Sequence, residues 1–93
     1  MDSASTEELR DEIRDIDAKI IDLLATRMDI SDELARVKKS SGQSVWDEKI
    51  EKTIIDRYRE LCEEVSLSKA EAEQIANLIL AISKERQTKI YNE

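Results

Sequence analysis

The sequence has no proline, no histidine and no phenylalanine, and it contains one glycine and one cysteine. Proline and glycine interrupt helices, so their near absence favours long helices over sheets and turns. The lone Cys62 excludes a disulfide within the chain, and the lack of histidine excludes the common zinc sites and nucleophile–histidine pairs. Any chemistry must therefore use carboxylates, amines, guanidinium groups, hydroxyls or amides.

The chain has 93 residues, and 22 acidic against 15 basic residues give it a net charge of −7. This length predicts a single domain over residues 1–93, near the size below which one core rarely stabilises a monomer. The negative average field would repel nucleic acids and anionic membranes, so we expect neither as a partner. No apolar run approaches the roughly 20 residues of a membrane span. Together with the lack of a secretory signal pattern, this indicates a cytoplasmic protein.

Helix-starting and helix-stopping residues divide the chain into three segments. A capping box of the S-x-x-E type at Ser5 begins a helix whose apolar spacing continues to about residue 39, before Gly42. A second helix is predicted over 47–64, and a third begins at another capping box, at Ser68, and continues nearly to residue 93. The sequence therefore predicts an all-α fold with one long N-terminal helix and two shorter helices.

The first helix carries an apolar seam that is longer than the other two helices can cover. Leucine, isoleucine and valine recur at steps of three and four from Leu9 to Val37. A helix of roughly 34 residues is about 50 Å long. Part of its seam can pack within the chain, and we expect the remainder to pack on a second copy, which gives an intertwined helical homodimer. A simple coiled-coil module is the alternative.

Two cations interrupt this apolar face. Arg27 occupies the seam position between Leu23 and Ile30, and Lys38 lies eleven residues later, close to three whole turns, on nearly the same side. The two are about 16 Å apart along the helix axis, so their long side chains could hold a small anion between them. In the absence of a ligand, a single arginine in such a seam most often fixes the register of two paired helices or extends its charged group to solvent.

The two shorter helices also carry polar pairs at helical spacing. Asp47 and Glu51 lie four residues apart at the start of the second helix, where free backbone amides already favour acidic groups. Ser83 and Gln87 lie four residues apart on an edge of the apolar stripe of the third helix. Capping alone accounts for Asp47, and Glu51 alone is unremarkable. Ser83 and Gln87 place two neighbouring hydrogen-bonding groups beside an apolar stripe.

Arg10 lies beside the seam near the start of the first helix. It is about 25 Å from Arg27 along the same helix, so it cannot reach a molecule held there by its own chain. If the first helices of two chains pair in an antiparallel arrangement, Arg10 of one chain approaches the interval between Arg27 and Lys38 of the other. The sequence thus permits two sites per dimer, each shared between the chains.

Taken together, these residues resemble the all-helical class of chorismate mutase, a small three-helix intertwined dimer. The resemblance covers about residues 7 to 91 without an internal gap. The matching positions are Arg10 in "ELRDEI", Arg27 in "LLATR", Lys38 in "ARVKK", and then Asp47, Glu51, Ser83 and Gln87.

The resemblance implies conversion of chorismate to prephenate by an intramolecular Claisen rearrangement, a step of aromatic amino-acid biosynthesis that leads to phenylalanine and tyrosine. This reaction needs no nucleophile, metal or cofactor. The resemblance also implies that Arg27, with Arg10 of the partner subunit, binds the carboxylates of the dianionic substrate.

The remaining matched residues take further roles by the same resemblance. Lys38 and Gln87 would donate to the ether oxygen as negative charge accumulates there. Glu51, with Asp47 nearby, would accept from the ring hydroxyl, and Ser83 would donate to the ring carboxylate.

Ile50 departs from the family pattern, which usually has an arginine immediately before the acidic residue of the second helix. The neighbouring Lys49 and Lys52 project to other sides of the helix, so neither is an assured substitute. The departure would weaken recognition of one substrate carboxylate or change the preferred substrate. Two alternatives therefore stand beside the mutase: an isochorismate pyruvate lyase on the same fold, and a non-catalytic helical dimerisation or regulatory module.

Overall fold

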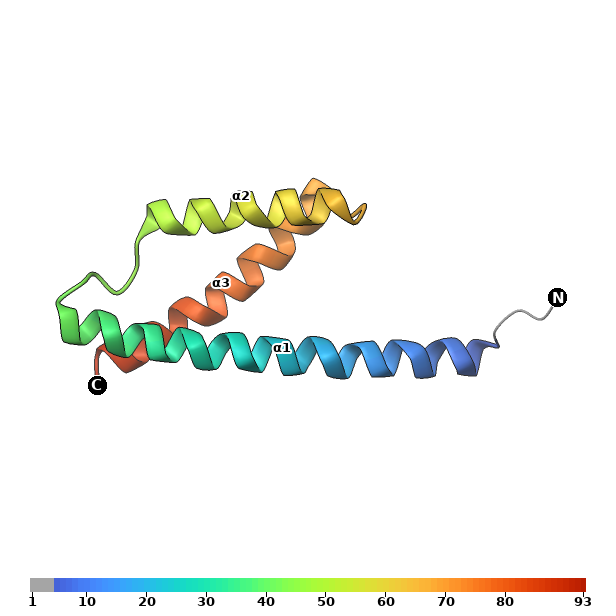
Figure 1. Ribbon diagram of the computed structural model, residues 1–93, viewed down its shortest axis with the longest axis horizontal. Helices are drawn as coiled ribbons and strands as arrows, with labels where there is room; N and C mark the ends of the chain where they lie inside the picture. The colour runs from blue at the N-terminus through green and yellow to red at the C-terminus, as the bar shows by residue number, and fades with distance from the viewer. Residues whose placement is uncertain (1–4) are drawn as a thin grey trace.

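The computed structural model describes residues 5–93 as three helices joined by two short connections (Figure 1). Helix α1 spans Thr6–Ser41, α2 spans Glu48–Glu64 and α3 spans Lys69–Tyr91. Over the described residues there is no strand. The prediction of an all-α chain with one long and two shorter helices is confirmed. None of the three helices is long and apolar enough to cross a membrane.

Each helix begins at a side chain that accepts a hydrogen bond from a free backbone N–H. The Ser5 hydroxyl accepts from the N–H of Glu8 at 3.1 Å, and the Asp47 carboxylate accepts from the N–H two residues later at 2.9 Å. At Ser68 the full capping box forms, because the Glu71 carboxylate also accepts from the Ser68 N–H. These bonds lower the pKa of Glu71. They fix where each helix starts.

Helix α1 ends at Gly42, which has the left-handed backbone angle φ of +72°. The N–H of Gly42 bonds to the carbonyl of Lys39, and the N–H of Gln43 bonds to the carbonyl of Lys38. Glycine adopts this conformation without the steric penalty of a Cβ atom. The chain can therefore leave α1 sharply and turn toward α2.

Helix α3 joins the other two helices. It packs against both α1 and α2, whereas α1 and α2 have no direct packing contact over the described residues (Figure 1). The buried residues are few and mostly small, and three of them are polar. They are Met28, Ser31, Ala35, Cys62, Ala72, Ala76, Leu80, Ser83 and Gln87. Small side chains at the contact allow the helix axes to approach closely.

The apolar seam of α1 is exposed along its length. The N-terminal half of α1 extends beyond the other helices (Figure 1). Ile13, in this half, is 57% exposed. Beside α3, where part of the seam was expected to pack within the chain, Ile30 is still 65% exposed. The α1 side chains buried there are Met28, Ser31 and Ala35 instead. The chain thus presents the whole seam to a potential partner.

An ion pair between Arg86 and Asp32 also joins α3 to α1. The Arg86 guanidinium donates to both carboxylate oxygens of Asp32, at 3.0 and 2.6 Å. The hydrogen bonding to Arg86 lowers the pKa of Asp32 below its ordinary value of 3.8. The pair therefore stabilises the fold above that pH, and this contribution is lost as the pH falls through the lowered pKa of Asp32.

We expect Gly42→Ala to lower the free energy of unfolding by about 1 kcal/mol, because alanine is strained at a positive φ. A Cβ at this position would meet no atom within 4 Å, so backbone strain is the whole effect. Gly42→Asn should lower the free energy of unfolding by less, since asparagine tolerates this conformation. Urea unfolding of the three proteins measures the difference. Equal losses for alanine and asparagine would contradict the assignment to backbone strain.

Candidate functional site

A cavity of about 660 Å³ lies between α1, α2, α3 and the connection over residues 42–47. Apolar side chains from the three helices form part of its wall, including Leu34, Ile54 and Leu80. Six of the seven site residues predicted from the sequence also line it. They are Arg27, Lys38, Asp47, Glu51, Ser83 and Gln87.

Arg10 is the predicted site residue that lies outside this cavity. It is exposed on the N-terminal half of α1, which extends away from α2 and α3 (Figure 1). The helical rise separates it from Arg27 by about 25 Å. Within one chain the structure does not bring Arg10 to the other six residues, in keeping with the expectation that only a partner subunit could supply it.

A hydrogen-bonded network joins several polar groups of the cavity wall. The Lys38 ammonium donates to the backbone carbonyl of Val45 at 2.9 Å and to Oε1 of Gln87 at 2.8 Å. The Gln87 amide nitrogen donates to the hydroxyls of Ser31 at 2.8 Å and Ser83 at 3.1 Å. Gln87 and both serines are buried. The network therefore ties α1, α3 and the connection between α1 and α2 together.

Burial of the Lys38 ammonium lowers its pKa below the ordinary value of 10.5, and the nearby Asp47 carboxylate opposes this shift. Water stabilises the charged form less at a buried position. An anion bound beside Lys38 would replace part of that lost hydration. Lys38 is thus a partly buried cation at the wall of the cavity, hydrogen-bonded to two neutral acceptors.

Arg27, Asp47 and Glu51 supply the other charges of the cavity. Arg27 is half-buried, and none of the ion pairs formed over residues 5–93 involves it. Asp47 already caps α2, which accounts for its position there. Glu51 is half-buried and accepts a hydrogen bond from the indole N–H of Trp46 at 3.0 Å. The guanidinium of Arg27 is therefore available to an anionic ligand.

Sequence reasoning missed two residues of this site, Ser31 and Trp46. Ser31 lies four residues after Arg27 and seven before Lys38, so helical spacing places it on their face and could have revealed it. Trp46 is the sole tryptophan and directly precedes Asp47, but its hydrogen bond to Glu51 depends on the path of the connection.

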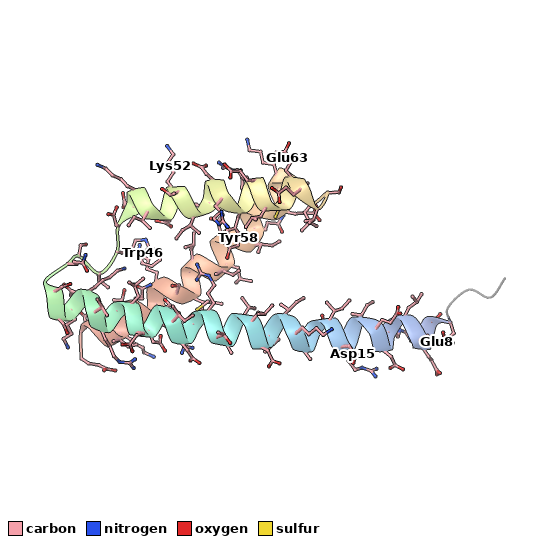
Figure 2. All side chains as sticks on the ribbon, in the orientation of Figure 1. Glu8, Asp15, Trp46, Lys52, Tyr58 and Glu63 are labelled. Carbon is pink, nitrogen blue, oxygen red and sulfur yellow. The ribbon has the colours of Figure 1, made fainter. Side chains whose placement is uncertain are left out.

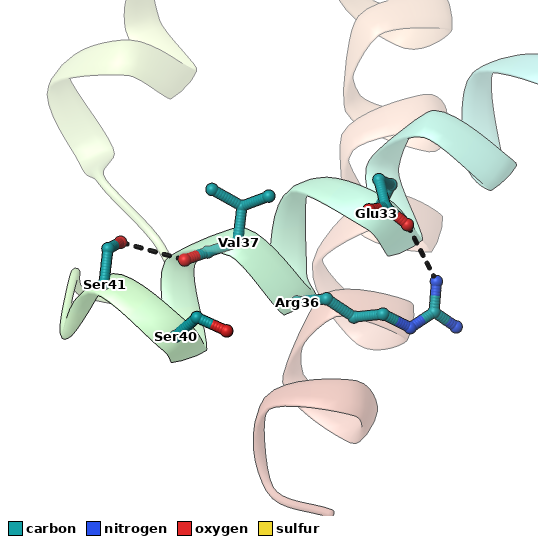
Figure 3. A pocket seen from close by; sticks show the side chains of 5 residues that line it. All are labelled: Glu33, Arg36, Val37, Ser40 and Ser41. Carbon is teal, nitrogen blue, oxygen red and sulfur yellow. Dashed lines mark hydrogen bonds and ion pairs between the residues drawn. The ribbon is translucent and has the colours of Figure 1, made fainter.

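A smaller depression of about 330 Å³ lies near the C-terminal end of α1 (Figure 3). Three of its polar side chains bond within the helix, because Glu33 pairs with Arg36 at 3.4 Å and the Ser41 hydroxyl donates to the carbonyl of Val37. Over residues 5–93, no three carboxylate or thiol side chains lie close enough together to hold a metal ion. The larger cavity is therefore the candidate site.

Known proteins provide an independent comparison. The family model described as chorismate mutase type II matches residues 9–88. This chain belongs to the chorismate mutase type II family. A chorismate mutase from Methanocaldococcus jannaschii is 31% identical over 86 residues, which cover 92% of this chain and 87% of that protein. No solved structure matches significantly. The family, an isomerase, is the one that the sequence resemblance predicts, and that prediction is confirmed.

We expect the chorismate mutase activity to fall on the alkaline side with a midpoint below pH 10.5, the ordinary lysine value, because the Lys38 pKa is lowered. Loss of the proton removes the charge that an anionic substrate requires. The measurement is kcat/KM from about pH 7 to about pH 11. Lys39→Gln, a neighbouring exposed lysine outside the cavity, is the matched control and should leave the alkaline fall unchanged. Constant kcat/KM up to pH 10.5 would argue against a charged Lys38 in the reaction.

Proposed function

We propose that this chain converts chorismate to prephenate in the cavity between its three helices. The observation that carries the proposal is the convergence of Arg27, Lys38 and Gln87 on one cavity in a chain of the chorismate mutase family. The product leads to phenylalanine and tyrosine, and we propose that the reaction serves this branch of aromatic amino-acid biosynthesis in the cytoplasm. A lone cysteine and an acidic composition agree with that location.

The reaction first requires a particular substrate shape. Chorismate is a flexible dianion whose enolpyruvyl side chain must fold over the ring before the new C–C bond can form. Holding that conformer supplies an orientational contribution to the rate. Arg27 and Arg10 of the partner subunit would bind the carboxylates, since a guanidinium offers a planar pair of donors. Binding at two separated points would fix the folded conformer.

The reaction next requires stabilisation of charge at the ether oxygen, where the C–O bond breaks. Two of the three Lys38 N–H groups donate to Val45 and Gln87, and the third would donate to this oxygen. Both present acceptors are neutral, so neither of these bonds neutralises the charge of the ammonium. A donor held in advance stabilises the transition state more than the ground state.

Gln87 would supply a second donor to the same ether oxygen after its side-chain amide group flips. Both of its N–H groups now donate to the hydroxyls of Ser31 and Ser83. If the amide oxygen and nitrogen exchange places, those hydroxyls can donate to the oxygen, because a hydroxyl both donates and accepts. The flipped amide would remain bonded to the serine side but would give up the bond from Lys38, whose freed N–H could then also turn to the substrate. An amide does not titrate, so the activity should not require acidic pH.

The rest of the cavity would bind the ring. Glu51, with Asp47 one turn before it, would accept from the ring hydroxyl, and Ser83 would donate to the ring carboxylate. Ile50 lines the cavity where family members usually have an arginine. Recognition of the ring carboxylate would therefore depend more on Ser83 and less on charge.

We also propose that the chain forms a homodimer through the α1 seam. Nine large apolar side chains along α1 are 46% exposed or more, an arrangement that a second copy would cover. They are Leu9, Ile13, Ile16, Ile20, Ile21, Leu23, Ile30, Leu34 and Val37. Antiparallel pairing of the seams would bring Arg10 of each chain to the cavity of the other.

A second candidate function is the release of pyruvate from isochorismate, which would use the same cations. The apolar Ile50 is the observation that favours it, because it changes the charge beside the ring. A purely non-catalytic helical module is the remaining alternative, and it would convert neither substrate.

The test is to incubate the protein with chorismate and, separately, with isochorismate. The incubation with chorismate should yield prephenate. Lys38→Ala should lower kcat by about 10²-fold or more, since it removes a donor at the developing charge. Lys39→Ala is the matched control and should keep full activity, and circular dichroism should show all three proteins folded. Free pyruvate without prephenate would overturn the mutase assignment, and no reaction with either substrate would favour the non-catalytic module.

Mixing Arg10→Ala and Arg27→Ala chains tests the shared site. Each variant dimer should be nearly inactive, whereas equal mixing after unfolding and refolding should recover roughly a quarter of the wild-type activity. Half of the dimers are then mixed, and each mixed dimer has one intact site of two. Size-exclusion chromatography should show dimers throughout. A lack of recovery would contradict the contribution of Arg10 to the partner's site.

A further inference from the structure

Trp46 contacts both an anion and a cation of the cavity. It extends from the connection between α1 and α2 into the space between the helices (Figure 2) and lines the cavity. Its indole N–H donates to the Glu51 carboxylate at 3.0 Å, and the Lys38 ammonium lies 5.8 Å from the ring centroid. The Lys84 ammonium lies 5.6 Å from the same ring. One half-buried side chain thus holds groups from α1, α2 and α3.

Two opposite charges of the cavity remain apart in the structure. Glu51 and Lys38 line the same cavity, and an ion pair between them would occupy the two groups and reduce the charge available to a ligand. Over residues 5–93, none of the ion pairs involves either residue. Glu51 is held by a neutral indole donor, and Lys38 by two neutral acceptors.

The indole is well suited to this task. Trp offers a donor and no acceptor, so its N–H holds the carboxylate without adding a charge. Its ring face attracts an ammonium, whereas its N–H lies in the ring plane at the edge. The carboxylate and the ammonium are therefore bound to different parts of one rigid group, which holds them at separate places on the cavity wall.

We propose that Trp46 is a positioning residue, which holds the Glu51 carboxylate toward the substrate hydroxyl and keeps it from the Lys38 ammonium. The inference rests on the proposed mutase reaction, because Glu51 has a substrate to contact only there. Trp46 itself takes no part in bond making or breaking.

A double-mutant cycle on kcat/KM tests whether Trp46 acts through Glu51. Trp46→Phe keeps a ring and removes the N–H, and it should lower kcat/KM on the order of tenfold, the effect of one hydrogen bond to a charged group. In a Glu51→Ala background the same change should matter by less than about twofold, because the acceptor is gone. Fully additive effects of the two substitutions would overturn the inference while leaving the mutase activity established.

The single indole N–H resonance gives a second readout that does not depend on turnover. With one tryptophan in the chain, a proton–nitrogen spectrum contains one such peak. It should shift in Glu51→Ala and stay in place in Glu48→Ala, the matched control, an exposed carboxylate of the same turn outside the cavity. A peak that does not move in Glu51→Ala would overturn the inference. If the wild-type protein leaves chorismate unchanged, the proposed function fails, and the positioning role of Trp46 fails with it. The indole peak would then report only the hydrogen bond between Trp46 and Glu51.

Discussion

The hydrogen bond from Lys38 to Gln87 joins the end of α1 to the last turns of α3, and the rest of the candidate site depends on it. A buried amide must satisfy its oxygen and nitrogen, so Gln87 fixes the rotation of α3 through Lys38 on one side and two serine hydroxyls on the other. Lys38 also binds the carbonyl of Val45, which places the connection that carries Trp46 and leads into α2. One polar network thus positions parts of all the elements that surround the cavity.

Polar groups at a helix contact are costly to bury unless they are paired, and this chain pairs them with neutral partners. In a direct ion pair inside the cavity, the two charges would neutralise each other, and little attraction for an anionic ligand would remain. Ion pairs do occur elsewhere over the described residues, as between Arg86 and Asp32, where they serve helix packing. In the proposed reaction, the site charges that form no ion pair would allow an acidic chain to bind a dianion.

Much of the fold could be predicted, because each helix begins at a serine or aspartate cap and α1 ends at Gly42, signals that are local in the sequence. The candidate site residues were recognisable as polar groups on apolar helix faces. The side of α1 that contacts α3 could not be recognised from the sequence. Its residues Ser31 and Ala35 are small, and they give a weaker periodic signal than the exposed isoleucines. The amide orientation of Gln87 and the Trp46 hydrogen bond depend on neighbours distant in the sequence, so no local pattern encodes them.

The unbroken length of α1 has a consequence for precision. No glycine or proline occurs between residues 6 and 41, so Arg10 sits on the same rigid rod as Arg27 and Lys38. At a separation of about 25 Å, each degree of bend between them displaces Arg10 by about 0.4 Å. A misplacement of about 1 Å can lower a rate by about 10²-fold. In the proposed dimer, the stiffness of α1 in one subunit would thus determine how precisely Arg10 is placed in the site of the other subunit.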